Sequence, residues 1–432
     1  MSSGDLVGIR KQLLDKISGR DIVVWGARMT GIGFARFMTS LGMQKPKLFI
    51  DSDPATHGKN VAGIPVWSPA RLPEIREKYE QLIIVVCVSI KEDEIVRILS
   101  GSGIDVDDYI IYSDYSAEYY TIDVVGSCNL RCASCVHGSS GFDIRKGLMS
   151  LEQLERVVEK MTRESFIVSH VSLYSWGEPM LNPELPGMLE YLHGQGIAVA
   201  CSTNLSYNDN NKLEKFIRSS PDYLKISLSG YYEEVYGKTH NGGNACLVKS
   251  NMYRLRYLID KYGTGTVVDV NYHLYNNNCG VNLVKMRELC DELGFMLSTT
   301  YALVMPLERV LDYCGGASSE ELRNLEKMLL VTIPEGIAAS AEVPITGCPY
   351  RDNQVNINFD LSVPVCCVVY DRRQDRMVTD NYLNVSLSEI NERKKRMAVC
   401  DMCIGYNLPQ YNMGFNRRKW DEIAGSKACF DR

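Results

Sequence analysis

The chain has 432 residues, of which 45% are hydrophobic and 23% are charged, and its formal net charge is −6. This length is more than one ordinary domain needs, and the composition is that of a globular protein rather than a disordered or fibrous one. The negative charge provides no general basic field for nucleic acid or acidic lipid, so we expect neither as a partner.

The first residues lack the basic and then apolar pattern of a secretory signal. No apolar run approaches the roughly 18 residues that a membrane span requires. These features predict a cytoplasmic protein. The chain also contains 15 cysteines, which in a large intracellular protein indicate metal or redox chemistry rather than disulfide bonds.

Residues 1–115 alternate between strand and helix patterns. Strands are predicted at residues 21–25, 47–51, 81–88 and near 109, and helices at 30–41 and 91–99. This alternation predicts a small doubly wound, Rossmann-like α/β domain.

A glycine-containing loop, Gly26 to Gly31, follows the first strand, and Asp51 ends the next one. This order is typical of dinucleotide-binding folds, but Arg28 replaces the glycine that lets the backbone approach a pyrophosphate. The segment from 49 to 66 resembles Rossmann-like domains appended to enzymes of surface-polysaccharide and nucleotide-sugar metabolism. Gly26, Arg28, Gly31 and Asp51 are therefore candidate nucleotide contacts, and a docking or dimerising module is the alternative.

Residues 116–330 contain a second alternating series. Strands are predicted at residues 120–125, 168–174, 197–201, 223–228, 266–274 and 295–301, with helical patterns between them. The series predicts a partial (β/α)6 barrel whose chemistry lies at the carboxyl ends of its strands. The periodicity weakens afterwards, so we assign residues 331–432 to a third domain.

Three cysteines with the spacing C-x3-C-x2-C, Cys128, Cys132 and Cys135, follow the first barrel strand. Thiolates at this spacing can bind three irons of a [4Fe–4S] cluster and leave the fourth iron open to another ligand. A zinc site with His137 as fourth ligand is the alternative.

At these cysteines the sequence resembles the radical S-adenosylmethionine (SAM) superfamily. The resemblance implies that SAM binds the open iron through its amino and carboxylate groups, and that its cleavage yields a 5′-deoxyadenosyl radical. The superfamily usually has an aromatic residue before the third cysteine, where this chain has Ser134.

Further polar motifs follow the next barrel strands. Trp176, Gly177, Glu178 and Pro179 are similar to the Gly-Gly-Glu-Pro motif of the superfamily, in which backbone groups approach the methionyl amino group. The resemblance also implies contacts to the carboxylate and ribose of SAM; the residues at the next strand ends are Ser202, Asn204, Ser227 and Ser229. Each polar run alone is also typical of a helix cap.

A second set of cysteines has the spacing C-x17-C-x33-C-x2-C, formed by Cys348, Cys366, Cys400 and Cys403. Four thiolates can bind another [4Fe–4S] cluster, and zinc is the alternative. Residues 347–406 resemble the SPASM and twitch extensions of the superfamily. We choose Cys366 rather than Cys367 as the ligand, because residues 355–363 alternate like a hairpin and adjacent strand residues face opposite ways.

The barrel interior is expected to bind the substrate. The candidate contacts are Tyr174, Lys225, Asn271, His273 and Tyr301. Asn271 and His273 alternate on one strand, so both are predicted to face inward, although His273 would also suit a core position.

An auxiliary cluster near the substrate favours oxidation or rearrangement of a small polar molecule, such as a sugar or sugar nucleotide. The alternatives are modification of a ribosomally made peptide and a non-catalytic metal scaffold. A flavodoxin or ferredoxin-type protein is the expected electron donor.

Overall fold

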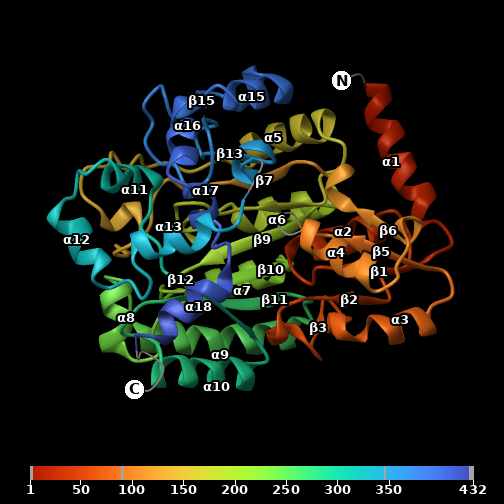
Figure 1. Cartoon of the computed structure of the whole chain (residues 1–432), viewed down its shortest axis with the longest axis horizontal. Helices are drawn as coiled ribbons and strands as arrows, with labels where there is room; N and C mark the ends of the chain where they lie inside the picture. Colours follow the sequence, from red (N-terminus) through yellow and green to blue (C-terminus); the bar gives the residue numbers. More distant parts are fainter. Residues whose placement is uncertain (1–2, 89–91, 345–346, 428–432) are drawn as a thin grey trace.

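The computed structural model describes residues 3–88, 92–344 and 347–427. Three sheets organise the described chain: six strands near the N-terminus, seven in the centre and two near the C-terminus. Figure 1 shows the N-terminal and C-terminal regions on opposite sides of the central sheet. This arrangement confirms the predicted α/β fold class.

The N-terminal sheet has the strand order β3-β4-β2-β1-β5-β6. Its strands are β1 (Asp21–Trp25), β2 (Leu48–Ile50), β3 (Asn60–Val61), β4 (Ile64–Trp67), β5 (Leu82–Val86) and β6 (Tyr109–Ile111). The helices are α1 (Ser3–Ile17), α2 (Met29–Ser40), α3 (Leu72–Lys78) and α4 (Glu92–Gly101). The predicted elements are confirmed, although residue 91 lies outside the described part; α1 and the β3–β4 hairpin were not predicted.

The central sheet has the order β12-β11-β10-β9-β8-β7-β13, and all its neighbouring strands are parallel. Its strands are β7 (Tyr119–Ile122), β8 (His170–Ser172), β9 (Ala198–Thr203), β10 (Tyr223–Ser227), β11 (Val267–Leu274), β12 (Met296–Tyr301) and β13 (Gln354–Ile357). The strands predicted for the barrel are therefore confirmed.

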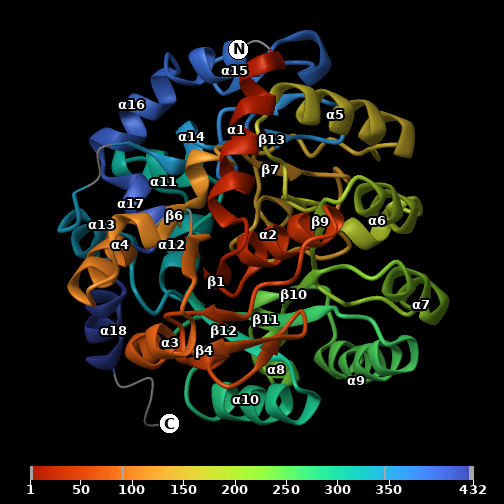
Figure 2. The same cartoon turned by 90° about the vertical axis from the view of Figure 1, so that its right-hand side faces the viewer.

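Helices cover the outer face of this sheet and form an arc in Figure 2. They are α5 (Leu151–Glu164), α6 (Leu185–Gly194), α7 (Asn210–Arg218), α9 (Ala245–Tyr262) and α10 (Val281–Leu293), with the shorter α8 (Glu233–Thr239) before α9. Their apolar faces and the outward side chains of the strands form one hydrophobic core. Burial of this apolar surface holds the sheet in its curved form.

The inner face of the central sheet is polar. On β10, Leu224 and Ile226 are fully buried in the core, whereas Lys225 and Ser227 keep accessible surface. Because successive strand residues point to opposite faces, this alternation places the polar side chains on the inner face. The sheet therefore offers a polar surface to a ligand.

The N-terminal domain packs against the amino ends of the central strands. Helix α2 contacts β8 and β9, and a Cβ atom on Gly33 would lie 3.0 Å from the Cβ atom of His170. Ala200 and Tyr223 of the central sheet share a hydrophobic core with Phe34. The two sheets are therefore joined by a packed interface.

The C-terminal region is mostly helical. Its elements are α11 (Leu307–Cys314), α12 (Glu320–Glu326), α13 (Ile333–Ala341), α14 (Pro349–Asp352), β14 (Val363–Pro364), β15 (Met377–Thr379), α15 (Leu387–Lys394), α16 (Ala398–Gly405), α17 (Leu408–Asn412) and α18 (Arg417–Gly425). Ser386 caps α15 by accepting a hydrogen bond from the N–H of Glu389.

The hairpin predicted at residues 355–363 is not formed. Strand β13 instead adds to β7 in parallel, and β14 pairs with β15. Alternating apolar residues identify a half-buried strand but not its partner, which here precedes β13 by more than 200 residues in the sequence. The region after residue 331 thus contributes a strand to the central sheet.

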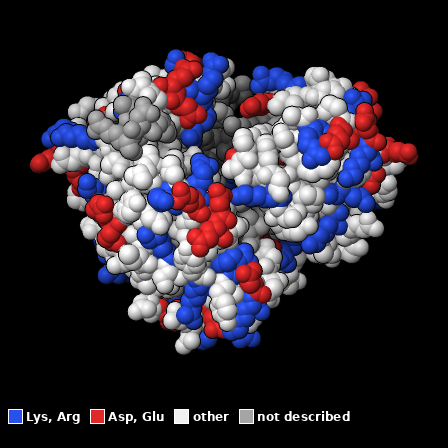
Figure 3. All heavy atoms as spheres, turned by 90° about the horizontal axis from the view of Figure 1, so that it is seen from below, with Lys and Arg blue, Asp and Glu red and all other residues white. Residues whose placement is uncertain are grey.

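Charged side chains of both signs are interspersed on the face of the molecule seen in Figure 3. None of the helices in the described ranges combines the length and the apolar character that crossing a bilayer requires.

Candidate functional site

The first cysteine set lies in the loop after β7, at the carboxyl end of the central sheet. The N–H groups of Arg131 and Ala133 donate to the carbonyls of Asn241 and Thr239, at 2.8 and 3.2 Å. A Cβ atom on Gly138 would lie 2.2 Å from the carbonyl oxygen of Cys132. The loop is thus held by the segment after α8 and by its own close packing.

The three thiols of this loop lie near one another. Burial raises the pKa of each thiol, to about 11 for Cys135, and the neighbouring thiols raise the pKa of Cys132 further. Thiolates held together in a buried loop need a compensating cation, which the irons of a cluster supply. The donor set therefore fits an iron–sulfur cluster.

Zinc binding by either cysteine set remains the alternative to an iron–sulfur cluster. No three His, Cys, Asp or Glu side chains within the described ranges are arranged around one ion position. His137, the ligand considered for zinc, is buried, and its Nε2 atom makes no hydrogen bond in the described structure.

The Trp176 to Pro179 turn follows β8 beside the cysteine loop. A Cβ atom on Gly177 would lie 1.8 Å from the carbonyl oxygen of Val125, so no larger residue fits without moving the backbone. The buried carboxylate of Asp123 accepts hydrogen bonds from the N–H groups of Trp176 and Gly177, at 3.0 and 3.3 Å. This contact fixes the turn against the end of β7.

Glu178 links the ends of β8 and β9. Its carboxylate accepts hydrogen bonds from the hydroxyl of Thr203 and the N–H of Asn204, both at 2.8 Å, and from the N–H of Met180 at 3.1 Å. Burial raises the pKa of Glu178 to about 7, and these donors oppose the rise. Its side chain therefore holds the turn in place.

Asn204 connects this turn with the cysteine loop. Its Nδ2 atom lies 3.6 Å from the Sγ atom of Cys128 and 2.9 Å from the Oδ1 atom of Asn129. The structure thus brings Cys128, Glu178 and Asn204 together from three adjacent strand ends.

The other predicted cofactor contacts occupy different levels of the sheet. Ser202 and Ser227 keep accessible surface on the inner face. Ser229 is fully buried, and its hydroxyl accepts a hydrogen bond from the N–H of His273 at 3.0 Å. Ser229 therefore has a structural partner within the fold.

Four of the predicted substrate contacts, Tyr174, Lys225, Asn271 and His273, are half-buried positions of the same sheet face. The structure corrects the prediction for Tyr301. Its hydroxyl donates to Asp421 of α18 at 2.6 Å, and its ring packs against Trp420. Tyr301 pairs in register with Leu274, the residue after His273 on β11. Because successive strand residues point to opposite faces, Tyr301 does not share the inner face with His273 and instead contacts the C-terminal region.

The second cysteine set surrounds a cavity beside α16. Cys348, Cys366, Cys400 and Cys403 line this cavity, and Cys367 is not among its lining residues. Burial raises the pKa of each of these thiols. The structure therefore brings together the four cysteines that the spacing selected.

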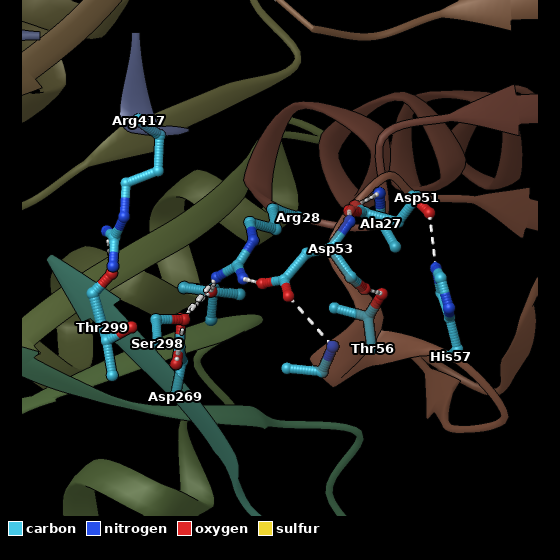
Figure 4. A network of polar contacts seen from close by, with 12 residues as sticks. Ala27, Arg28, Asp51, Asp53, Thr56, His57, Asp269, Ser298, Thr299 and Arg417 are labelled. Carbon is cyan, nitrogen blue, oxygen red and sulfur yellow. Dashed lines mark hydrogen bonds and ion pairs between the residues drawn. The ribbon is translucent and has the colours of Figure 1, made fainter. Parts of the chain in front are cut away.

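The side chain of Arg28 reaches from the glycine loop to Asp269 and Ser298 of the central sheet (Figure 4). Its guanidinium donates to Asp269 at 2.7 Å, to Ser298 at 2.8 Å and to Asp53 at 2.5 Å. Asp51 accepts a hydrogen bond from the N–H of Ala27 at 2.8 Å. Arg28 is thus engaged in the domain interface.

The geometry of the glycine loop bears on the predicted nucleotide site. Gly26 has a φ of 116°, and a Cβ atom on Gly31 would lie 1.9 Å from the carbonyl oxygen of Gly26. The glycines therefore serve the tight turn into α2. Nucleotide binding by this loop remains a prediction. Arg28 is no longer a candidate phosphate contact, because its guanidinium is bound to Asp269, Ser298 and Asp53.

Sequence reasoning missed Asp123 and the docking role of Arg28. A carboxylate inside the apolar run of residues 120–125 is unusual, and it marks Asp123 in the sequence. Asp269 offers the same signal on β11, where it is buried and accepts from Arg28, Tyr223 and Ser298.

The chain was compared with known proteins. Residues 122–272 match the family model of the Radical SAM superfamily. The chain is 27% identical to Fe-coproporphyrin III synthase of Methanosarcina barkeri over 106 residues. This matched stretch covers 24% of this chain and 26% of that protein. The chain thus spans about a quarter of this curated relative.

Solved structures with similarity include anSMEcpe with bound AdoMet, with 16% identity and a TM-score of 0.45, covering 71% of this chain and 97% of that one. SuiB of Streptococcus suis has 12% identity and a TM-score of 0.45, covering 70% and 76%. BtrN in complex with AdoMet and 2-DOIA has 12% identity and a TM-score of 0.37, covering 66% and 88%.

The family match begins at the end of β7 and ends within β11, so it includes the cysteine loop, the Trp176 to Pro179 turn and the inner face of β10. These are the elements that the structure assembles at the carboxyl edge of the central sheet. Residues 122–272 therefore form a domain of the Radical SAM superfamily.

Proposed function

We propose that this enzyme abstracts hydrogen from a small polar substrate and oxidises or rearranges it, with a sugar or sugar nucleotide as the preferred class. The observation that carries this proposal is the position of Cys128, Glu178 and Asn204 above a polar sheet face. Cofactor and substrate would meet there.

In this proposal Cys128, Cys132 and Cys135 hold a [4Fe–4S] cluster, and the Trp176 to Pro179 turn holds SAM. When bound, this pair supplies a 5′-deoxyadenosyl radical. The chain itself supplies rigidity, because Asp123 and Glu178 fix the turn from two strands. Gly177 leaves room for a close backbone approach.

The inner face would bind a polar substrate. Burial lowers the pKa of His273 to about 4, so its imidazole is neutral at pH 7. The amide of Asn271 lies 3.5 Å from Nε2 of this imidazole. Neutral donors and acceptors of this kind suit hydroxyl groups and position the reacting carbon.

We further propose that Cys348, Cys366, Cys400 and Cys403 would hold an auxiliary [4Fe–4S] cluster, which would supply one-electron redox chemistry for substrate oxidation. Lys394 supports this assignment: burial lowers the pKa of this lysine to about 8, and the nearby cysteines and Asp352 oppose the fall, so a cationic group lies beside the cysteine set. Its positive charge compensates thiolate charge in this region. A flavodoxin or ferredoxin-type protein is the proposed electron donor.

Metal content and cofactor cleavage test this proposal. Anaerobic reconstitution should give about eight irons and eight sulfides per chain, as two [4Fe–4S] clusters require. With dithionite and SAM, the enzyme should release 5′-deoxyadenosine. Cys132→Ala should abolish this release, whereas Cys246→Ala, at an exposed cysteine of α9, should retain it.

Each outcome has a defined meaning. About four irons per chain would remove the auxiliary cluster, and zinc without sulfide would contradict the radical reaction. A fully loaded enzyme that releases no 5′-deoxyadenosine would also contradict it.

A thermal-shift screen tests the substrate class. Nucleotide sugars should raise the melting temperature of the loaded enzyme more than peptides do, since bound ligand stabilises the folded state. Stabilisation by peptides alone would favour peptide modification instead.

A further inference from the structure

The inner face of the central sheet contains a lysine that the proposed cofactor site does not use. Lys225 lies in the middle of β10 between two fully buried residues. Its side chain is half-buried, and the alternation along β10 places it on the inner face of the sheet. The lysine therefore points into the region assigned to the substrate.

Lys225 has no carboxylate partner within salt-bridge distance in the described structure. The nearest acidic group on the adjacent strand is Asp269, its register partner. Asp269 is already satisfied by Arg28, Tyr223 and Ser298 at 2.5 to 2.8 Å. Arg28 thus pairs directly with Asp269, which acts on Lys225 from beyond salt-bridge distance and still raises the pKa of its ammonium group.

The groups around Lys225 keep it charged. Tyr174 raises the pKa of Lys225 more than burial lowers it, and the ammonium nitrogen lies 5.6 Å from the centre of the Tyr174 ring. Burial and Lys225 itself lower the pKa of His273 to about 4. Lys225 is therefore protonated at pH 7, and the imidazole of His273 beside it is neutral.

The strand register gives the depth of Lys225 below the cofactor residues. Lys225 pairs with Ser202 of β9, and Asn204, which contacts Cys128, follows two residues later. Two residues of an extended strand span roughly 7 Å. This is the length of a small molecule with its reacting carbon near the cofactor and its far end at the lysine.

We propose that Lys225 binds an anionic group of the substrate, a carboxylate or a phosphate, and so orients the reacting carbon toward the cofactor. This inference deepens the proposed function and rests on it for the identity of the ligand as substrate. A buried cation facing a ligand space binds such a group with a charge-assisted hydrogen bond.

Isothermal titration of the reconstituted enzyme with inorganic phosphate and with acetate tests the proposal, at constant ionic strength and with glycerol as the neutral control. We expect saturable binding of at least one anion and none of glycerol. Lys225→Met and Lys225→Gln should weaken this binding about tenfold or more, whereas Lys225→Arg should retain most of it. The preferred anion distinguishes a phosphorylated substrate from a carboxylated one.

Lys249→Met is the matched control. Lys249 also lies against a tyrosine ring, 3.9 Å from the centre of Tyr231, but on helix α9 outside the inner face. This variant should bind the anions as the wild type does. Circular dichroism of all variants verifies folding, and two neutral replacements at Lys225 guard against one that does not fold.

Three results would overturn the proposal: no saturable anion binding by the wild type, equal binding by the folded Lys225 and Lys249 variants, or a loss of SAM affinity in Lys225→Met. The last result would assign Lys225 to the cofactor. The titrations need no turnover, so their outcome is independent of whether 5′-deoxyadenosine is released.

Discussion

Gly177 occupies a position where a single methyl group is excluded. A Cβ atom there would lie 1.8 Å from the carbonyl oxygen of Val125, far inside van der Waals contact. We predict that Gly177→Ala displaces the end of β7, destabilises the protein by about 2 kcal/mol or more, and abolishes SAM binding. Urea unfolding and calorimetric SAM titration measure the two effects.

Gly187 of α6 provides the control for this substitution. A Cβ atom there would approach only the end of the Leu151 side chain, at 3.5 Å. Gly187→Ala should therefore leave SAM binding unchanged and preserve or raise stability, because alanine favours the helix. Normal SAM affinity in Gly177→Ala would contradict the assigned role of the turn.

His240 links stability to pH at a position that supports the cysteine loop. Its ring is buried and stacked on Tyr236, and burial lowers its pKa to about 3. The folded state therefore favours neutral His240. The resulting stability is complete above the reference pKa of 6.5 and is lost as the pH falls toward the folded pKa.

We predict that His240→Phe removes this dependence while keeping the ring stack. Between pH 6.5 and 5 the wild type should lose about 2 kcal/mol through His240, and the variant should lose correspondingly less. Urea unfolding of both apoproteins at the two pH values gives this difference. Equal losses would show that His240 does not titrate in this way.

At the scale of elements, the segment after β13 packs directly against the strand that leads to the cysteine loop. The ring of Phe359 lies between Gly126 and Gly147, and a Cβ atom on either glycine would lie 2.2 Å from that ring. The N–H of Gly126 donates to the carbonyl of Gly147 at 2.9 Å. Phe359 of the C-terminal region thus packs against Gly126, two residues before Cys128.

Phe359→Ala should open this slot, because the Phe359 ring itself occupies the space beside both glycines. The expected cost is about 2 kcal/mol for a half-buried ring, with faster hydrogen exchange at the amide of Gly126. Tyr257→Ala, at a tyrosine that is 62% exposed, should change stability by less than about 0.5 kcal/mol. Unchanged hydrogen exchange at the amide of Gly126 would mean that the Phe359 ring does not support the cysteine loop.

At the scale of the whole molecule, Arg28 couples the N-terminal domain to the barrel. The side chain of Asp269 is 1% exposed, so removing its cationic partner leaves a buried carboxylate uncompensated. We predict that Arg28→Met costs about 2 to 3 kcal/mol and that adding Asp269→Asn recovers part of this loss. Urea unfolding of the single and double variants measures the coupling.

Arg20→Met is the control for this interface, because Arg20 pairs with the partly exposed Asp108 within the N-terminal domain. Such a pair contributes about 1 kcal/mol or less. Additive losses in the Arg28 and Asp269 double variant would contradict the coupling.

The local features of this protein were predictable from the sequence. Most strands of the two large sheets, apart from β3 and β4, are encoded within short segments, where periodicity and turn chemistry act, and so are the cysteine spacings and the Trp176 to Pro179 turn. The alternation of side chains along single strands also predicts that Lys225, Asn271 and His273 lie on the inner face of the sheet.

Only the tertiary structure decided the features that depend on distant partners. Strand β13 joins β7, Arg28 reaches Asp269 across the domain interface, and Tyr301 faces α18. Each contact joins residues more than 100 positions apart. The local sequence pattern determines to which face of an element a side chain points. Packing between distant segments determines what covers that face, and only the folded chain shows this packing.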